Sequence, residues 1–219
     1  MKRQIPNLLT CLNLAIGCAG IYYTLTNKEP SAFYFVIIAG LLDFTDGFAA
    51  RILKVQSDMG KQLDSLSDLV SFGLLPSFFM LQWLLQSGSE FYWVAIIIAI
   101  FSAIRLAKFN IDETQSDSFK GLPTPANAIM LTSLTFVSFE LYEYTLISIC
   151  IFSAILLVSP IRLIALKFSS SGWKGNEERW ILLMGILILA TVFQWTFIPF
   201  LIPFYIVVSV FSFLIRKKT

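Results

Sequence analysis

Long apolar stretches alternate with short polar ones along almost the whole of the 219-residue chain. Most of these stretches reach the ~17–25 residues that a helix needs to cross the hydrocarbon layer of a membrane. They run without interruption and lack the periodicity of a soluble core, so lipid is the expected solvent for most of the chain. We therefore predict an all-α, polytopic transmembrane helix bundle of about eight spans, drawn approximately over residues 7–25, 31–53, 62–86, 90–109, 123–140, 143–166, 180–196 and 198–215.

The last two segments are the least regular of the eight. Pro199 and Pro203 interrupt them, and the connection near Thr196 is very short. One re-entrant hairpin is the alternative to two full spans at this end of the chain. The length leaves no room for a separate soluble domain, so we expect a single membrane-embedded domain over residues 1–219.

The basic residues predict the orientation of the bundle. If the N-terminus is cytoplasmic and the spans alternate, every lysine and arginine of the 16 except Lys28 falls on the cytoplasmic side. Cytoplasmic loops of membrane proteins carry such an excess of positive charge. The asymmetry therefore supports an even number of spans, with the N- and C-termini both in the cytoplasm. The polar connections over about 110–122 and 167–179 are expected along that membrane surface.

Composition narrows the chemistry that the chain can perform. The sequence is 57% hydrophobic, with a mean hydropathy of +0.76 and no histidine, so metal binding and acid–base chemistry must rest on carboxylates. The net charge of +2 is too small to argue for a nucleic-acid partner. The three cysteines lie inside apolar runs at spacings that fit no metal motif. We interpret them as small packing residues outside any disulfide framework.

Four aspartates occupy a predicted hairpin of two membrane helices within residues 31–86. Charges inside a membrane cost about 2.5–3.5 kcal/mol each on insertion scales, so these side chains must face inward and be compensated. One face of the first helix carries positions i, i+3, i+4 and i+7, namely Asp43, Asp46, Gly47 and Ala50. One face of the second carries i, i+4 and i+8, namely Gly60, Asp64 and Asp68.

The two helices should bring these carboxylates to one level of the membrane. With helix ends at Lys54 and Gly60, Asp46 and Asp68 each lie ~12 Å from the turn and level with one another, at 1.5 Å per residue. Asp64 is then expected one turn nearer the cytoplasm, and Asp43 about one turn deeper. The result is a carboxylate cluster in the cytoplasmic half of the membrane.

Clustered carboxylates without histidine or thiolate favour hard divalent cations, Mg²⁺ or Mn²⁺, with Ca²⁺ also compatible. Gly47 and Gly60 remove side chains where a ligand could approach the backbone closely. Arg51 offers a bidentate fork for phosphate at the cytoplasmic end of its helix. Two other readings of the aspartates stay open, namely hydrogen bonding between helices and the ion site of a cation transporter. Both are less favoured, because four acids share one level with two glycines and an arginine.

The stretch from Asp43 to Asp68 has the form D-x2-D-G-x2-A-R-x8-G-x3-D-x3-D. It resembles the signature of the CDP-alcohol phosphatidyltransferase family at every fixed position. The resemblance implies an enzyme that joins the phosphoalcohol of a CDP-alcohol to an acceptor hydroxyl and releases CMP. It also implies two metal ions on Asp43, Asp46, Asp64 and Asp68, with Asp68 as the base that deprotonates the acceptor. Gly47, Ala50, Arg51 and Gly60 would then line the CDP pocket.

Three further stretches resemble the phosphatidylserine synthase branch of that family, beginning at Pro6, Ala103 and Phe119. This likeness implies CDP-diacylglycerol as donor and L-serine as acceptor. It adds Thr10 and Asn13 as candidates for the CDP pocket, with hydrogen bonds to a neighbouring helix as the other reading. It also adds Arg105, Asn110 and Lys120 as candidates for the acceptor, although Arg105 equally fits an interfacial anchor. Glycerol 3-phosphate or an inositol phosphate is the alternative acceptor, which Arg105, Lys108 and Lys120 keep open. The family resemblance further implies a homodimer in a prokaryotic inner membrane, with the active site facing the cytoplasm.

Overall fold

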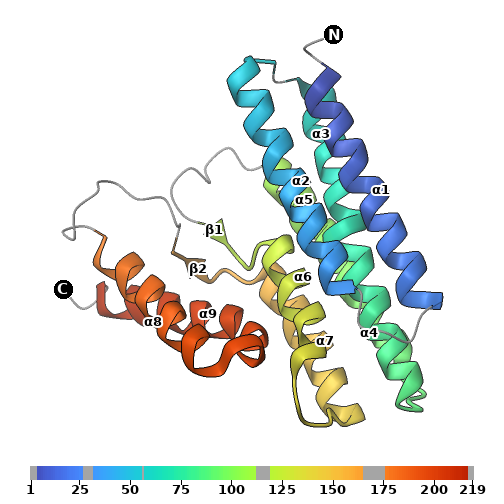
Figure 1. The fold of residues 1–219 in the computed structure, drawn as a ribbon, viewed down its shortest axis with the longest axis vertical. Helices are drawn as coiled ribbons and strands as arrows, with labels where there is room; N and C mark the ends of the chain where they lie inside the picture. The colour runs from blue at the N-terminus through green and yellow to red at the C-terminus, as the bar shows by residue number, and fades with distance from the viewer. Residues whose placement is uncertain (1–3, 27–31, 56, 112–118, 165–175, 217–219) are drawn as a thin grey trace.

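The computed structural model describes residues 4–26, 32–55, 57–111, 119–164 and 176–216. Its helices are α1 (Ile5–Thr26), α2 (Ala32–Leu53), α3 (Asp58–Asp68), α4 (Leu75–Gln86), α5 (Ile96–Ile111), α6 (Thr124–Thr132), α7 (Glu143–Val158), α8 (Glu177–Phe193) and α9 (Ile198–Arg216). A π-helical turn, Leu69–Leu74, joins α3 to α4, and short 3₁₀ turns cover Tyr92–Ala95, Ser133–Phe136 and Gln194–Phe197. Two strands, β1 (Phe119–Lys120) and β2 (Arg162–Leu163), complete the order (Figure 1).

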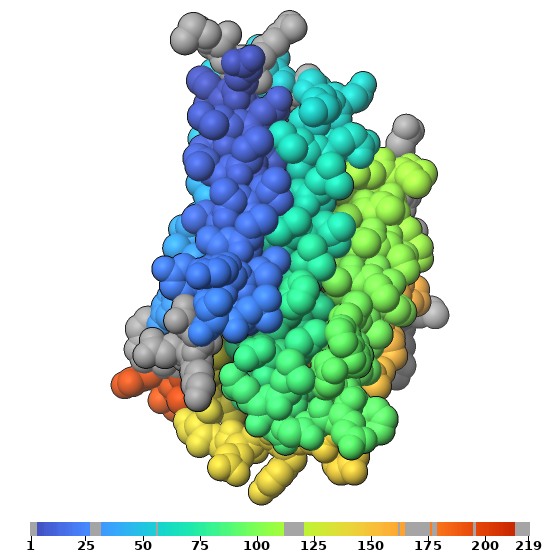
Figure 2. Space-filling model, turned by 90° about the vertical axis from the view of Figure 1, so that its right-hand side faces the viewer, coloured from blue at the N-terminus to red at the C-terminus, as the bar shows by residue number. Residues whose placement is uncertain are grey.

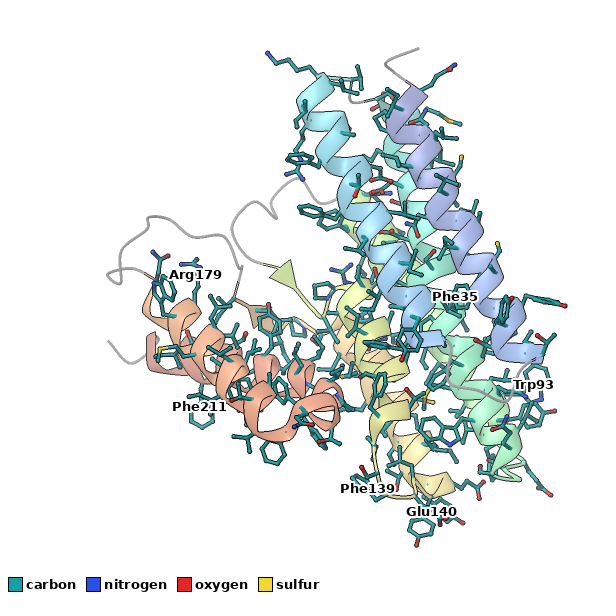
Figure 3. The ribbon with its side chains drawn as sticks, viewed as in Figure 1. Phe35, Trp93, Phe139, Glu140, Arg179 and Phe211 are labelled. Carbon is teal, nitrogen blue, oxygen red and sulfur yellow. The ribbon has the colours of Figure 1, made fainter. Side chains whose placement is uncertain are left out.

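The first four predicted spans are confirmed as long apolar helices. Four helical stretches of the described chain are long and apolar enough to cross a membrane, namely Ile5–Thr26, Ala32–Leu53, Asp58–Gln86 and Tyr92–Ile111. They run side by side as one elongated bundle (Figure 1). Far from the N-terminus, Phe139 and Glu140 lie between α6 and α7, and Trp93 lies at the end of the bundle itself (Figure 3). Trp93 is exposed there, as expected of an aromatic side chain at a membrane–water interface.

The C-terminal half departs from the predicted series of full spans. The segment expected over 123–140 contains only α6, nine residues long, followed by the 3₁₀ turn Ser133–Phe136. The chain then turns extended at Val137, with φ −73° and ψ 131°. Thirteen residues at 1.5 Å each cover about 20 Å, which is less than the ~30 Å hydrocarbon layer. The count of eight spans therefore stays a prediction.

The last two helices form a pair that lies at a steep angle to the α1–α5 bundle (Figure 1). The predicted interruption at Pro203 is not a helix end, because α9 continues through this proline. The pair is joined by a tight turn at Gln194, which has a positive φ of 50°. Helix α9 contacts both α6 and β2, so the C-terminal pair packs against the middle of the fold.

A short antiparallel ladder joins part of the predicted surface loop 110–122 to the end of the predicted span 143–166, where α7 has already ended at Val158. Phe119 pairs with Leu163, and Lys120 pairs with Arg162. Gly121 follows with a φ of +77°, and its N–H donates to the carbonyl of Ile161 at 2.9 Å. A side chain at Gly121 would meet the backbone around Leu157, so this turn requires glycine. The ladder anchors the entry into α6 to the chain that leaves α7.

Small and hydroxyl-bearing residues let α1 approach α3 and the π-helical turn closely. Ser67 Oγ donates to the carbonyl of Thr10 at 3.0 Å, and Ser71 Oγ donates to the carbonyl of Asn13 at 3.1 Å. Gly17 packs against Ser71 with no room for a side chain. The space-filling view shows α1 lying along the α3–α4 stretch with no gap (Figure 2). This packing fixes α1 beside the helix that carries two of the aspartates.

The packing role predicted for all three cysteines holds only for Cys150, which is buried in the core. Cys11 and Cys18 are exposed on α1. Their apolar surroundings in the sequence reflect lipid contact instead of core contact, a distinction that hydropathy alone does not make. All three are free thiols, as predicted.

Candidate active site

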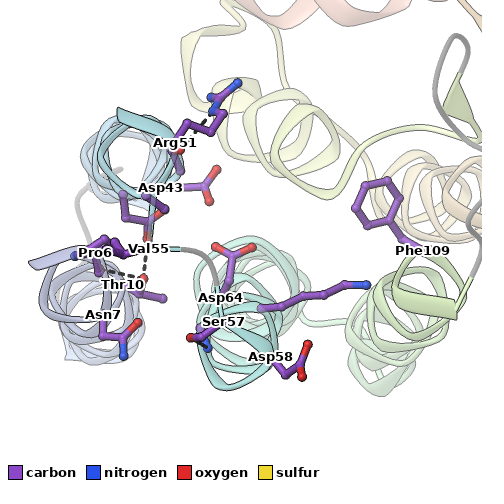
Figure 4. A pocket seen from close by; sticks show the side chains of 15 residues that line it. Pro6, Asn7, Thr10, Asp43, Arg51, Val55, Ser57, Asp58, Asp64 and Phe109 are labelled. Atoms are coloured by element: carbon purple, nitrogen blue, oxygen red, sulfur yellow. Dashed lines mark hydrogen bonds between the residues drawn. The ribbon is translucent and has the colours of Figure 1, made fainter. Parts of the chain in front are cut away.

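Three of the four aspartates converge between α2 and α3. Asp43 on α2 and Asp64 and Asp68 on α3 each offer one carboxylate oxygen, and these oxygens lie within 4.8 Å of one another. Asp43 and Asp64 face each other across the space between the two helices (Figure 4). All three side chains are partly buried. Such a group of oxygens from two helices is the arrangement in which a hard divalent cation is bound.

The depths of the aspartates along the two helices differ from the prediction. Helix α3 begins at Asp58, two residues before the expected start, and α2 ends at Leu53. Counted from these ends at 1.5 Å per residue, Asp43 and Asp68 both lie about 15 Å from the turn. Asp43 is thus the residue level with Asp68, in place of Asp46. The early start has a local cause, since Ser57 caps α3 by accepting the N–H of Gly60 at 3.1 Å.

Asp46 is the most buried of the four carboxylates and is held by α1. It is 4% exposed, and its Oδ2 accepts a hydrogen bond from Thr10 Oγ1 at 2.6 Å. The same hydroxyl lies 3.0 Å from the carbonyl of Pro6, so the contact with Asp46 is the shorter of the two. Thr10 therefore bonds to a neighbouring helix and orients a carboxylate next to the cluster.

A cavity of about 740 Å³ opens beside the aspartates. Its lining combines one end of α1, the second half of α2, the first turns of α3 and one residue of α5 (Figure 4). The lining residues are Pro6, Asn7, Thr10, Asp43, Asp46, Gly47, Ala50, Arg51, Val55, Ser57, Asp58, Gly60, Lys61, Asp64 and Phe109. Every residue predicted for the CDP pocket lies here except Asn13, which is fully buried outside this lining.

The two glycines of the cavity differ in how much room they leave. A methyl group on Gly47 would meet nothing within 4 Å, so it would project into open space of the cavity. A methyl group on Gly60 would approach Ser57 Oγ at 3.2 Å and Asn7 Oδ1 at 3.3 Å. Gly47 thus keeps the cavity wall flat for a ligand, whereas Gly60 also allows the close packing of the cap. Arg51 lies at the same rim, and its Nε donates to the Gly47 carbonyl at 3.0 Å.

Two features of the aspartates suit divalent metal ions, namely the type of donor atom and a buried oxygen that lacks a hydrogen-bond partner. All candidate ligands are carboxylate oxygens, the donors preferred by Mg²⁺, Mn²⁺ and Ca²⁺. Asp68 Oδ1 is buried and has no hydrogen-bond partner among the described residues. A buried carboxylate oxygen in that state calls for a cation. Two divalent ions would also balance the charge of four carboxylates.

The sequence profile of the CDP-alcohol phosphatidyltransferases matches residues 3–159, which is well over half of the chain. The chain belongs to the CDP-alcohol phosphatidyltransferase family. The matched range contains the aspartate cluster, the cavity and the entry into α6, and it ends just after α7. The pair formed by α8 and α9 lies outside the matched range.

Several curated relatives of this phosphatidyltransferase carry a more specific name. The CDP-diacylglycerol–serine O-phosphatidyltransferase of Bacillus subtilis is 37% identical over 134 residues, covering 60% of this chain and 75% of the relative. The Helicobacter pylori protein of the same name is 28% identical over 216 residues, covering 88% of this chain and 91% of the relative. An archaetidylserine synthase of Methanothermobacter thermautotrophicus is 29% identical over 164 residues, covering 72% and 68% of the two chains.

Two of the three predicted acceptor residues, Arg105 and Asn110, lie on α5. Arg105 is close enough to Asp68 for their charges to interact, and its Nε is buried without a hydrogen-bond partner among the described residues. Asn110 is engaged in packing, since its Nδ2 donates to Ser65 Oγ at 2.8 Å. Lys120 lies in β1, but its side chain falls outside the part of the chain that the structure describes. Of the three, Arg105 is the one that the structure places beside Asp68.

The cavity of this phosphatidyltransferase includes residues that sequence reasoning missed. Lys61 lines it from α3, and its Nζ donates to the carbonyl of Asn110 at 2.9 Å, which ties α3 to α5. Asn7, Ser57 and Phe109 complete the wall. The helix-cap pattern at Ser57 was a readable signal. No sequence pattern pointed to Lys61 or Phe109, because they enter the wall only through the packing of α5 on α3.

Proposed function

We propose that this chain transfers the phosphatidyl group of CDP-diacylglycerol to the hydroxyl of L-serine and releases CMP. The observation that carries the proposal is a cavity of about 740 Å³ against an inward-facing aspartate cluster. The family supplies the CDP-alcohol class of donor. The names of the relatives from Bacillus subtilis and Helicobacter pylori support serine as the acceptor.

The donor occupies the cavity at the α2–α3 turn in this proposal. Arg51 holds a phosphate at the rim, and the flat wall at Gly47 and Ala50 admits the nucleotide. Gly60 and Thr10 complete the same pocket. The two acyl chains then lie outside the bundle, against the exposed apolar face of α2, which includes Leu41, Phe44 and Phe48.

We assign two divalent ions, Mg²⁺ or Mn²⁺, to Asp43, Asp46, Asp64 and Asp68. When bound, such a pair neutralises the diphosphate and aligns attacking and leaving oxygens for in-line displacement. Asp43, Asp64 and Asp68 present oxygens to a common space. Thr10 holds Asp46 in one orientation through the 2.6 Å hydrogen bond.

Asp68 accepts the proton of the serine hydroxyl in the proposed reaction. The serine oxygen then forms a bond to the phosphorus that carries diacylglycerol, while the bond from that phosphorus to the CMP oxygen breaks. The products are phosphatidylserine and CMP, and the proton leaves from Asp68 to solvent. The unpartnered, buried Oδ1 of Asp68 supports a role beyond packing.

The alternative acceptors, glycerol 3-phosphate and an inositol phosphate, carry a further phosphate that needs extra cationic side chains. Lys108, one of the residues that kept this option open, is exposed on α5. Arg105 places a positive charge close enough to Asp68 for the two charges to interact. One guanidinium is sufficient to pair with the single carboxylate of serine, whereas acceptors with a further phosphate need more than one cation. Membership in the family disfavours the cation-transporter reading.

The placement in the cell follows from the bundle and the basic residues. We propose an integral protein of a prokaryotic inner membrane, with both termini and the active site at the cytoplasmic face. We also propose one membrane domain over residues 1–219 and a homodimer. The four long apolar helices support the membrane assignment, and the charge asymmetry of the loops supports the orientation.

The test is release of CMP by the purified protein in detergent, with CDP-diacylglycerol and Mn²⁺ or Mg²⁺. L-Serine, glycerol 3-phosphate and an inositol phosphate are offered in parallel, and Asp68→Asn is the inactive control. The proposal expects release only with serine, lost in Asp68→Asn. CMP release that requires one of the other acceptors would assign that acceptor in place of serine. If folded protein releases no CMP with any of the three acceptors, the proposed enzymatic activity is rejected.

A further inference from the structure

A group of buried polar side chains beyond Asp68 has no partner in the described part of the chain. Asn127 on α6 is 0% exposed, and neither its Nδ2 nor its Oδ1 forms a hydrogen bond. Ser102 on α5 and Thr124 on α6 are 0% and 1% exposed, and their hydroxyl oxygens are also unpartnered. Several other buried hydroxyls of the fold bond to backbone carbonyls, as Thr132 does to Ala128 at 2.7 Å. Polar groups left unpaired in a core are uncommon and call for a ligand or ordered water.

These side chains lie next to the catalytic end of α3. Ser102 is one turn from Arg105 on the same face of α5, and Arg105 interacts with Asp68. Ser102 also faces Gly73 in the π-helical turn, where a methyl group on the glycine would come within 3.0 Å of Ser102 Cβ. Gly73 is five residues past Asp68, which places it about 7 Å deeper along the helix.

Helix α6 closes the same region from the other side. Thr124, Asn127 and Leu131 share its buried face, and α6 packs against both α5 and the π-helical turn. The π-helical turn starts directly after Asp68. Single π-turns inside α-helices are found frequently at functional sites. Helices α5 and α6 therefore bring unpaired polar groups to the π-helical turn that follows Asp68.

The donor cavity does not extend to the unpaired side chains. Its lining includes Asp43, Asp46 and Asp64, but neither Asp68 nor any of the unpaired side chains on α5 and α6. In-line displacement requires the attacking oxygen to approach opposite the leaving group. An acceptor seated beyond Asp68 would attack from that side.

We propose that Asn127, with Ser102 and Thr124, binds the amino-acid end of the acceptor in a polar site behind Asp68. Asn127 Oδ1 and a hydroxyl oxygen accept from the ammonium group, while Arg105 binds the carboxylate and the acceptor hydroxyl points to Asp68. Neutral amide and hydroxyl groups match a zwitterion, which presents donors and acceptors together. This site assignment rests on the proposed serine transfer.

The test compares Asn127→Leu, which keeps the volume and removes the polar atoms, with Thr132→Val on the same helix. Thr132 is equally buried, but its hydroxyl is satisfied by its own helix. Asn127→Leu should raise the KM for L-serine at least tenfold and leave the KM for CDP-diacylglycerol unchanged. Thr132→Val should change neither constant. Thermal unfolding in detergent establishes that both variants are folded.

A second readout separates ligand binding from packing. 3-Hydroxypropanoate has the hydroxyl and carboxylate of serine but lacks its ammonium group. The preference of the wild-type protein for serine over this analogue should shrink in Asn127→Leu. If Asn127→Leu does not fold, Ser102→Ala takes its place, with the same two readouts and an expected threefold or larger rise in the KM for serine.

The outcomes separate this assignment from the proposed function. A wild-type protein that releases CMP without any dependence on serine rejects the proposed function itself. A serine-dependent wild type whose folded variants keep an unchanged KM and an unchanged preference for serine rejects only the Asn127 site. In that case the unpaired groups hold water.

Discussion

Replacing Thr10 by valine tests whether α1 orients a metal-binding carboxylate. Valine keeps the shape of threonine and removes only the hydroxyl that donates to Asp46 Oδ2 at 2.6 Å. The backbone carbonyl of Thr10, which accepts from Ser67, is unaffected. Asp46 would remain buried but lose its only side-chain donor among the described residues. Its carboxylate would then be free to rotate away from the proposed metal position.

The expected loss of metal affinity follows from the kind of hydrogen bond that Thr10→Val removes. A hydrogen bond to a charged group contributes about 1.5–3 kcal/mol. With about 1.4 kcal/mol for each factor of ten, the loss corresponds to roughly a 10- to 100-fold change. Residues that orient metal ligands cause changes of about the same size when they are replaced. Thr10→Val should therefore need about 10- to 100-fold more Mn²⁺ for half-maximal activity.

The assay is a Mn²⁺ titration of CMP release at saturating CDP-diacylglycerol and serine. Thr24→Val is the matched control, because Thr24 is a buried threonine of the same helix that donates to the Gly20 carbonyl at 2.7 Å. It lies 14 residues, or about 21 Å, from Thr10. Thr10→Ser should restore most of the metal affinity. An unchanged Mn²⁺ midpoint in folded Thr10→Val would refute the orienting role.

Two further substitutions probe the cavity wall and the C-terminal pair. Gly47→Ala should raise the KM for CDP-diacylglycerol several-fold without loss of thermal stability, because the methyl group enters the open cavity. The control is Gly40→Ala, on the same helix but outside the cavity lining, which should leave this KM unchanged. Equal KM values for the two variants would argue against a nucleotide at this wall. Tyr205→Phe removes the hydroxyl that donates to the Ile164 carbonyl at 2.7 Å. This substitution should lower the free energy of unfolding by about 1 kcal/mol. The control, Tyr144→Phe at an exposed position, should leave it unchanged. Equal unfolding temperatures for the two variants would contradict the anchoring of β2 by α9.

The convergence of Asp43, Asp64 and Asp68 could be predicted from the sequence because helical spacing is a local property. The i, i+4 spacing of Asp64 and Asp68, and the inward position of Asp43, follow from helix geometry alone. The relative depth of Asp43 and Asp68 could not be predicted in the same way, because it depends on the start of α3 at Asp58. A shift of two residues moves a side chain by about 3 Å along the axis, enough to exchange one partner for another.

Features that depend on contacts between distant segments could not be predicted. The hydrogen bond from Thr10 to Asp46 joins residues 36 apart in the sequence. The shortness of α6 and the β1–β2 ladder depend on packing between α7, α9 and the entry to α6. The unpaired state of Asn127 is invisible in the sequence, where it is one asparagine in an apolar run. Hydropathy located the helices, but it did not tell lipid-facing residues such as Cys11 from buried ones such as Cys150.

The most direct test of the central claim follows labelled L-serine into lipid as Mn²⁺ is added back to metal-stripped protein with CDP-diacylglycerol. The account predicts no labelled lipid without metal, and equal amounts of labelled phosphatidylserine and CMP once Mn²⁺ is restored. It also predicts that Asp43→Asn and Asp64→Asn fail to recover at the Mn²⁺ concentration that restores the wild type. Labelled lipid formed without metal, or CMP released without label entering lipid, would contradict an aspartate-bound metal site that transfers phosphatidyl groups to serine.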